Sequence, residues 1–175
     1  MTGSRVLAGA LESALRRQLS SLDALAARLP AHAESERPAV PAGAPALRRT
    51  DELLGHLLDA CSGFAAALQG LHPRRLVWLD ELRSPSVGRA LGAAAFRREL
   101  ARIGAALARA LPELDDADLA RRVPSVLHPG GQTGLELLIG NLEHVASHRQ
   151  ELFTRLRMAG VPVTTAHLYG LAARE

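Results

Sequence analysis

Leucine and alanine recur along this chain every three or four residues, which is the period of an amphipathic α-helix. The pattern covers residues 6–29, a stretch after Thr50 that stops near Gly70, residues 85–111 and residues 133–159. No segment alternates apolar and polar residues with the period of two that a half-buried strand requires. The pattern therefore predicts an all-α protein built from four long helices.

Proline and glycine residues mark the ends of these helices. Pro30 ends the first helix, Pro112 closes the third, and Gly160 followed by Pro162 stops the fourth. Residues 31–46 are proline-rich and predict an irregular crossover, long enough to pass over one end of a helical bundle. Residues 74–84 are ambiguous, a short helical turn follows Asp115, residues 124–131 form a loop, and residues 163–175 form a C-terminal tail. We expect one domain over residues 1–175.

Composition narrows the class of protein. Hydrophobic residues make up 47% of the chain but aromatic residues only 3%, so the core must consist mainly of Leu, Ala and Val. No run approaches the 18 apolar residues of a membrane span, and the arginine-bearing N-terminal segment predicts an amphipathic helix rather than a signal peptide. A single cysteine excludes an intrachain disulfide. These features predict a cytoplasmic protein without membrane association.

The basic charge does not indicate nucleic-acid binding. Net charge is +3, and all 21 basic residues are arginine, which accounts for most of the high isoelectric point. The arginines are scattered beside acidic residues, and no basic block is interleaved with aromatic residues. We therefore expect no nucleic-acid partner. The absence of lysine also excludes Schiff-base and phosphate-loop chemistry.

Two histidines one helical turn apart, His144 and His148, are the most informative feature of the fourth helix. Residues at i and i+4 share a helix face, so the two rings can bind one metal ion. At about 100° per residue, the apolar face comprises Leu138, Val145, Leu152 and Leu156. The histidines lie along its edge, together with Asn141, Glu151 and Arg155. The solvent face comprises Glu143, Ser147, Gln150 and Thr154. The alternative is two histidines that are hydrogen-bonded or solvated at the rim of the core.

His56 on the second helix is a third candidate, with Glu52 and Asp59 about one turn to either side. Taken alone it fits a partly buried polar residue. If it meets the pair, three imidazoles would bind a metal and leave one position open, without selecting which metal.

Several known metal sites are excluded by the neighbours of these histidines. Val145 follows His144, so the His-Glu-x-x-His of zinc proteases is absent, and no Glu-x-x-His of di-iron bundles occurs at the three histidines. Cys61 lies roughly 140° around the helix from His56 and is expected to be a small core residue.

The segments Gly55-His-Leu-Leu-Asp-Ala60 and His144-Val-Ala-Ser-His-Arg-Gln150 resemble the DinB/YfiT-like superfamily of metal-binding four-helix bundles. The stretches 156–162 and 168–171 are also similar to that family. The resemblance implies a four-helix bundle in which His56, His144 and His148 bind a divalent metal, zinc or nickel. Many relatives have His-Arg-Gly-Gln where this chain has His148-Arg-Gln-Glu151, which leaves the subfamily open.

The resemblance also implies a reaction class, because relatives include thiol-dependent S-transferases and a thiol-dependent maleylpyruvate isomerase. We expect an enzyme that transfers a small-molecule thiol to an electrophilic small-molecule substrate, and a homodimer. The alternatives are a metal-dependent hydrolase and a non-catalytic metal- or ligand-binding bundle.

Five charged side chains are candidates for supporting roles in such an enzyme. Glu52, Asp59 and Glu151 could orient a histidine or act as a base. Arg149 and Arg155 could hold the anion of a carboxylated thiol. For each of the five, a charge on the helix surface is the alternative.

Overall fold

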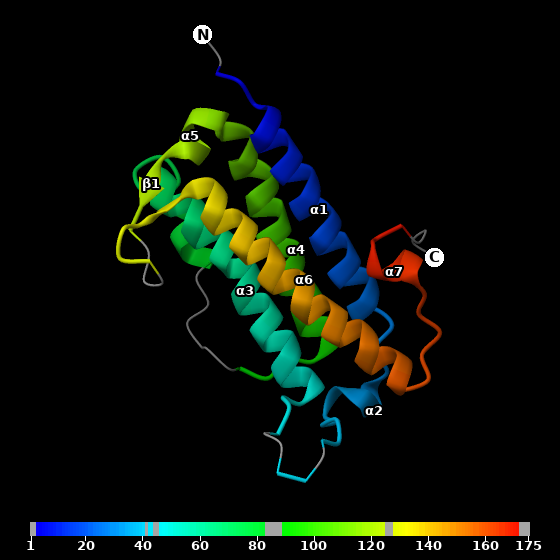
Figure 1. Cartoon of the computed structure of the whole chain (residues 1–175). Coiled ribbons are helices and arrows are strands. Elements are labelled where there is room, and N and C mark those ends of the chain that lie inside the picture. Colours follow the sequence, from blue (N-terminus) through cyan, green and yellow to red (C-terminus); the bar gives the residue numbers. More distant parts are fainter. Residues whose placement is uncertain (1–2, 41, 44–45, 83–88, 125–127, 172–175) are drawn as a thin grey trace.

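Four long helices make up most of the protein (Figure 1). The computed structural model describes residues 3–40, 42–43, 46–82, 89–124 and 128–171. The long helices are α1 (Val6–Ala26), α3 (Thr50–Leu71), α4 (Ala93–Ala110) and α6 (Gly134–Met158). The short helices are α2 (Ala31–Glu34), α5 (Asp116–Ala120) and α7 (Thr165–Leu168), with 3-10 turns η1 (Val77–Leu82) and η2 (Leu111–Glu113).

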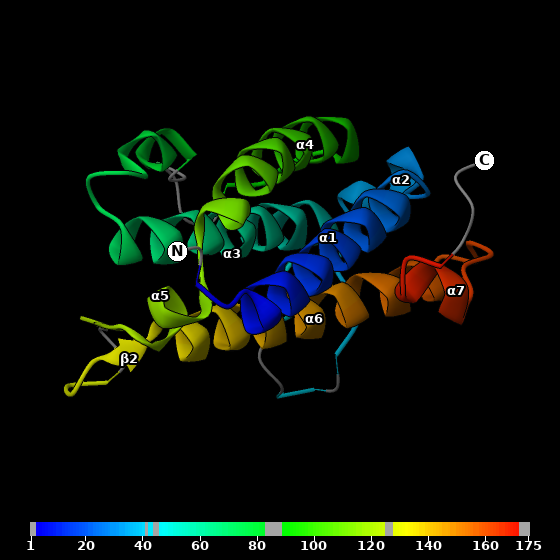
Figure 2. The ribbon, with the colours of Figure 1, turned by 90° about the horizontal axis from the view of Figure 1, so that it is seen from above.

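The long helices form a bundle in which each packs against two neighbours. α3 contacts α4 and α6, and α1 contacts the same two helices from the other side. Figure 2, turned by 90° from the view of Figure 1, shows α3 and α1 between α4 and α6. The α3/α6 seam and the α1/α4 seam therefore lie on opposite faces of the bundle.

The helix faces are those that the periodicity predicts. On α6, Leu138, Val145, Leu152 and Leu156 are fully buried, whereas all four residues of the predicted solvent face are exposed. Phe64 of α3 and Phe96 of α4 are fully buried among leucines from every long helix. Burial of a large apolar side chain contributes roughly 1.5–3 kcal/mol, so this core holds the bundle together. The predicted all-α fold is confirmed.

Side chains from distant segments cap two of the long helices. Asp116 of α5 accepts hydrogen bonds from the backbone N–H groups of Val6, Leu7 and Ala8 and from the Ser4 hydroxyl. These bonds satisfy the free N–H groups at the start of α1 and lower the pKa of Asp116. Likewise, Glu34 of α2 accepts the first backbone N–H of α4, from Ala93.

The structure differs from the sequence prediction in three places. The third helix begins at Ala93 rather than at residue 85, because residues 89–92 lie against α3, where the Leu91 N–H donates to the Asp51 carbonyl. Residues 83–88 lie outside the described part of the chain. The predicted irregular crossover contains the short helix α2.

The third difference is a pair of short strands at the predicted 124–131 loop. β1 (Arg122–Val123) and β2 (Gln132–Thr133) pair antiparallel, although no strand was expected. Two residues per strand are too few to show a period of two in the sequence.

No helix among the described residues is long and apolar enough to cross a membrane.

Candidate metal centre

Three histidine rings converge at the α3/α6 seam. Nε2 of His56, from α3, lies 3.1 Å from Nε2 of His148 and 3.1 Å from Nε2 of His144, both from α6. One ring nitrogen from each lies within 4.8 Å of the others. The rings meet edge to face, with interplanar angles of 73°, 75° and 86°. The structure therefore brings together the three residues named from the sequence, and this cluster could hold a metal ion.

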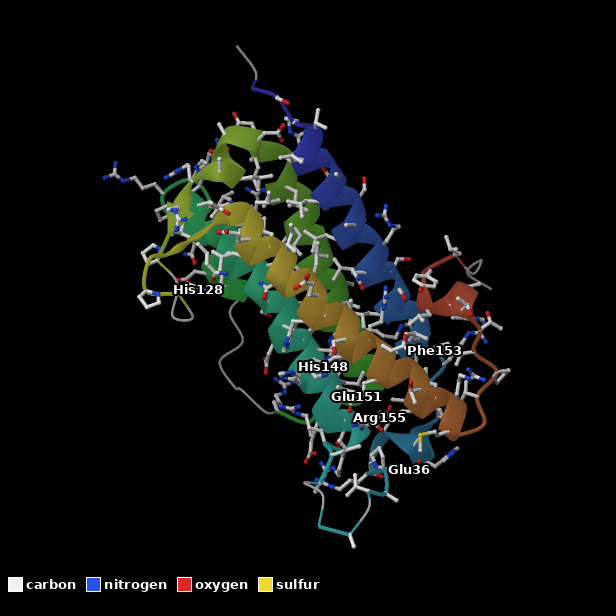
Figure 3. The ribbon with its side chains drawn as sticks, in the orientation of Figure 1. Glu36, His128, His148, Glu151, Phe153 and Arg155 are labelled. Atoms are coloured by element: carbon white, nitrogen blue, oxygen red, sulfur yellow. The ribbon has the colours of Figure 1, made fainter. Side chains whose placement is uncertain are left out.

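Glu151 fixes the orientation of His148. Its Oε2 lies 3.0 Å from Nδ1 of His148, so we assign the Nδ1 proton to this bond. The Nε2 lone pair of His148 then faces the cluster. Arg155 donates to Oε1 of the same carboxylate. In Figure 3, His148, Glu151 and Arg155 follow one another along α6. Metal-binding histidines usually have such a carboxylate or carbonyl partner on the second nitrogen.

The surroundings of the cluster favour the neutral form of His56 and of His144. Burial and the charge of Arg48 lower the pKa of His56, as do His148 and His144, while Asp59 opposes the shift. Burial, His148 and Arg48 lower the pKa of His144. A neutral imidazole is the form that binds a metal.

The charge of Glu151 follows from its partners. Burial alone would raise its pKa, but hydrogen bonds from His148 and Arg155 lower it. Glu151 is therefore an ionised acceptor at neutral pH.

The cluster is open on one side, since His144 is exposed while His56 and His148 are half-buried. Beside it, Asp59 lies one turn after His56 on α3. Its Oδ2 is buried and has no hydrogen-bond partner among the residues that the structure describes. Three imidazoles and an open side fit a divalent metal that keeps one position for another ligand.

Other sequence candidates lie away from the cluster or are engaged elsewhere. Glu52 accepts the Arg49 N–H at 2.6 Å and pairs with Arg37, so it caps α3. Arg149 points toward Tyr169 after α7, with its guanidinium 5.8 Å from that ring. Arg155 is buried rather than on the surface.

Cys61 has no contact with the solvent. Its side chain is fully buried, and burial raises the pKa of the thiol to about 12. The thiolate is therefore scarce at neutral pH, and Cys61 is the small core residue that was predicted.

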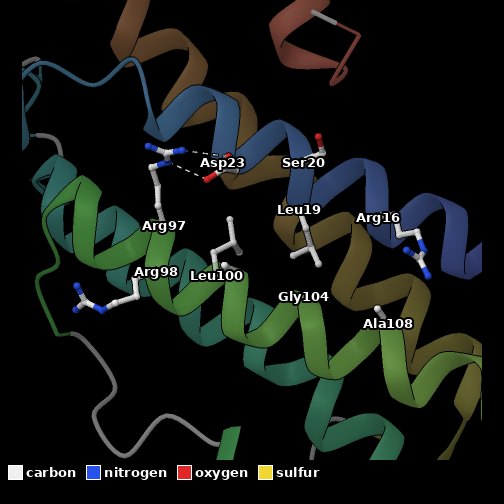
Figure 4. Close-up of a pocket in the computed structure, with 10 residues that line it drawn as sticks. Arg16, Leu19, Ser20, Asp23, Arg97, Arg98, Leu100, Gly104 and Ala108 are labelled. Carbon is white, nitrogen blue, oxygen red and sulfur yellow. Dashed lines mark hydrogen bonds and ion pairs between the residues drawn. The ribbon is translucent and has the colours of Figure 1, made fainter. Parts of the chain in front are cut away.

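A second feature of the surface is a groove between two other helices. A groove of about 710 Å³ follows the α1/α4 seam, with the Asp23–Arg97 ion pair at one end (Figure 4). This seam is on the opposite face of the bundle from the histidines. Among the residues that the structure describes, the group of side chains that could hold a metal ion is at the α3/α6 seam and not in this groove.

Comparison with known proteins agrees with this structure. The sequence profile of the DinB superfamily matches residues 14–152, a span that includes all three histidines. This chain belongs to the DinB superfamily. Among curated proteins, none is significantly similar to it in sequence.

A solved structure shows the same fold. The crystal structure of YjoA, a DinB-like protein from Bacillus subtilis, superposes with a TM-score of 0.64 over 87% of this chain and 96% of that chain. The two sequences are 18% identical, so the likeness extends to the fold alone. The predicted family and bundle fold are confirmed.

Proposed function

We propose that His56, His144 and His148 bind one divalent metal ion, zinc or nickel, and that this DinB superfamily member is a metal-dependent thiol transferase. The observation that carries the proposal is the convergence of three Nε2 atoms from two helices, with Glu151 behind His148. A metal held there would lower the pKa of a thiol or water at its remaining position and so supply a nucleophile near neutral pH.

The chain's own residues have distinct tasks in this proposal. Glu151 holds the His148 ring, and Arg155 holds Glu151 in turn. The carboxylate of Asp59, one turn after His56 on α3, receives the S–H proton of the incoming thiol. The sulfur electron pair forms a new C–S bond to the electrophilic carbon, and the leaving group departs with its bonding pair. Because His144 is exposed, both reactants can reach the cluster from solvent.

An assay of thiol transfer tests this function. Untagged protein would be loaded with zinc or nickel, or treated with chelator, and mixed with a chromogenic aryl chloride and bacillithiol, mycothiol, glutathione or cysteine. We expect chloride release that requires both the metal and one of the thiols. Asp59→Asn should lower kcat, whereas Glu143→Gln on the exposed face of α6 should not.

Two outcomes would contradict the proposal. Metal-dependent turnover without any thiol would indicate a hydrolase. Stoichiometric metal without turnover of any thiol would indicate a non-catalytic binding bundle.

A further inference from the structure

A second pocket, of about 230 Å³, lies where α2 and the segment after it pass the C-terminal end of α6. Its walls are mainly apolar and include Leu29, Ala33, Pro38 and Met158. The polar residues of the lining are Glu36, Arg37, Thr50 and Arg155. In Figure 3, Glu36 and Arg155 lie at this same end of the molecule.

Arg155 is an unusual residue to line such a pocket. Its side chain is only 6% exposed, although arginine is rarely buried without full pairing. One terminal nitrogen binds Glu151, and the other reaches the Thr50 hydroxyl at 3.5 Å. The buried Nε has no hydrogen-bond partner among the described residues. This guanidinium therefore has an N–H donor that none of the described residues uses.

We propose that this pocket binds the carboxylate of a small organic acid, with Arg155 as its charge partner. The planar guanidinium matches a carboxylate in shape and charge, and the apolar walls suit a hydrocarbon body. Two arginines line the pocket: Arg155, which pairs with Glu151, and Arg37, which pairs with Glu52. The volume is below the roughly 300–1,000 Å³ of sites for drug-sized ligands, so the acid is small.

Arg155, which lines the pocket, relates it to the histidine cluster on the same helix, α6. Arg155 follows His148 by seven residues, about 10 Å along the helix axis. Glu151 contacts both side chains, so a ligand on Arg155 shares the guanidinium with the carboxylate that orients His148. We infer that the pocket holds the carboxylate end of the substrate or the thiol, and this assignment rests on the proposed function. Binding of the organic acid in the pocket does not rest on the proposed function.

Calorimetry with hexanoate and hexanamide as probes tests the pocket, on both chelator-treated and zinc-loaded protein. The probes have the same chain length but differ in charge. We expect saturable binding of one hexanoate per chain and at least about tenfold weaker binding of hexanamide. Equal affinities for the two probes, or no binding of hexanoate, would overturn the proposal.

Two variants of the same loop locate the binding site. Ala39 is exposed and lines the pocket, so Ala39→Phe should block it and abolish hexanoate binding. Ala42 is exposed but is not among the lining residues, so Ala42→Phe should bind hexanoate as the wild type does. Unchanged binding in Ala39→Phe would place the probe elsewhere.

Arg155→Gln removes the positive charge and should weaken the binding of hexanoate at least about tenfold. Circular dichroism checks that this variant is folded. If it does not fold, the hexanoate binding of Ala39→Phe decides whether the pocket is the binding site.

Zinc titration of Ala39→Phe separates this inference from the proposed function. Normal zinc binding and thiol transfer without hexanoate binding in the wild type would overturn the acid pocket alone. Hexanoate binding without zinc binding would overturn the metal centre alone.

Discussion

Glu151 connects the two charged features of α6, because one carboxylate oxygen contacts His148 and the other contacts Arg155. Both contacts span three or four residues on the same helix, so they form wherever this stretch is helical. Their effect is to present the Nε2 lone pair of His148 toward His56. The orientation of His148, a ligand in the proposed metal site, therefore depends on a side chain that lies outside the cluster itself.

Glu151→Gln tests this dependence. Glutamine cannot supply a charged acceptor to the His148 Nδ1–H, so zinc affinity should fall by about 10–100-fold. Competition with a chromogenic chelator measures the affinity. Glu143→Gln, on the exposed face of the same helix, should retain wild-type affinity. Equal zinc affinity in both variants would show that Glu151 does not position His148.

At the residue scale, the sequence predicted less than the structure shows. Helical spacing places His144 and His148 together, but nothing local indicates that His56 meets them across 88 residues. That expectation came from the family resemblance. Arg155 could be read as a surface charge, since burial of an arginine depends on α2 and the segment after it covering the end of α6.

At the scale of helices, α3 approaches the segment 89–92 very closely. A Cβ built on Gly55 would lie 1.7 Å from the Arg89 carbonyl oxygen. No side chain can occupy that space unless the backbone moves. The glycine directly before His56 therefore allows this segment to pack on α3.

Gly55→Ala should destabilise the protein by about 1–3 kcal/mol, because the added methyl group separates two backbones. Urea denaturation measures the free energy of unfolding. Gly9→Ala is the matched control: Gly9 is inside α1, with nothing within 4 Å of a new Cβ. That substitution should stabilise by about 0.5–1 kcal/mol. Comparable effects of both substitutions would contradict the close approach.

The cap that Asp116 gives α1 predicts a dependence on pH. Its folded pKa is lowered from 3.8 by the Ser4 hydroxyl and the N–H groups of α1. The stabilisation is therefore fully present above pH 3.8 and is lost as pH falls through the folded pKa. Asp116→Asn should lower the Tm at neutral pH, and the difference from wild type should shrink below pH 3.8. A difference that is the same at both pH values would mean that the charge of Asp116 is not involved.

Helix positions followed from the sequence where they depend on periodicity, and not where they depend on tertiary contacts. The faces of α6 are those predicted. The start of α4 is not, since it depends on Glu34, which caps Ala93 from 59 residues away. Such a contact leaves no periodic signal in either segment.

At the scale of the whole molecule, the order of the helices around the bundle places the histidine cluster and the long groove on opposite faces. The histidine cluster and the acid pocket both involve α6, whereas the long groove follows the α1/α4 seam on the opposite face. Formation of a homodimer stays a prediction from the sequence.

The metal content of untagged protein tests the central claim most directly. Plasma mass spectrometry after dialysis against zinc or nickel should give one ion per chain. The metal content per chain should fall markedly in each of the variants His56→Ala, His144→Ala and His148→Ala. It should not fall in His128→Ala, which changes an exposed histidine. Substoichiometric metal in the wild type, or full occupancy in the three variants, would contradict the account.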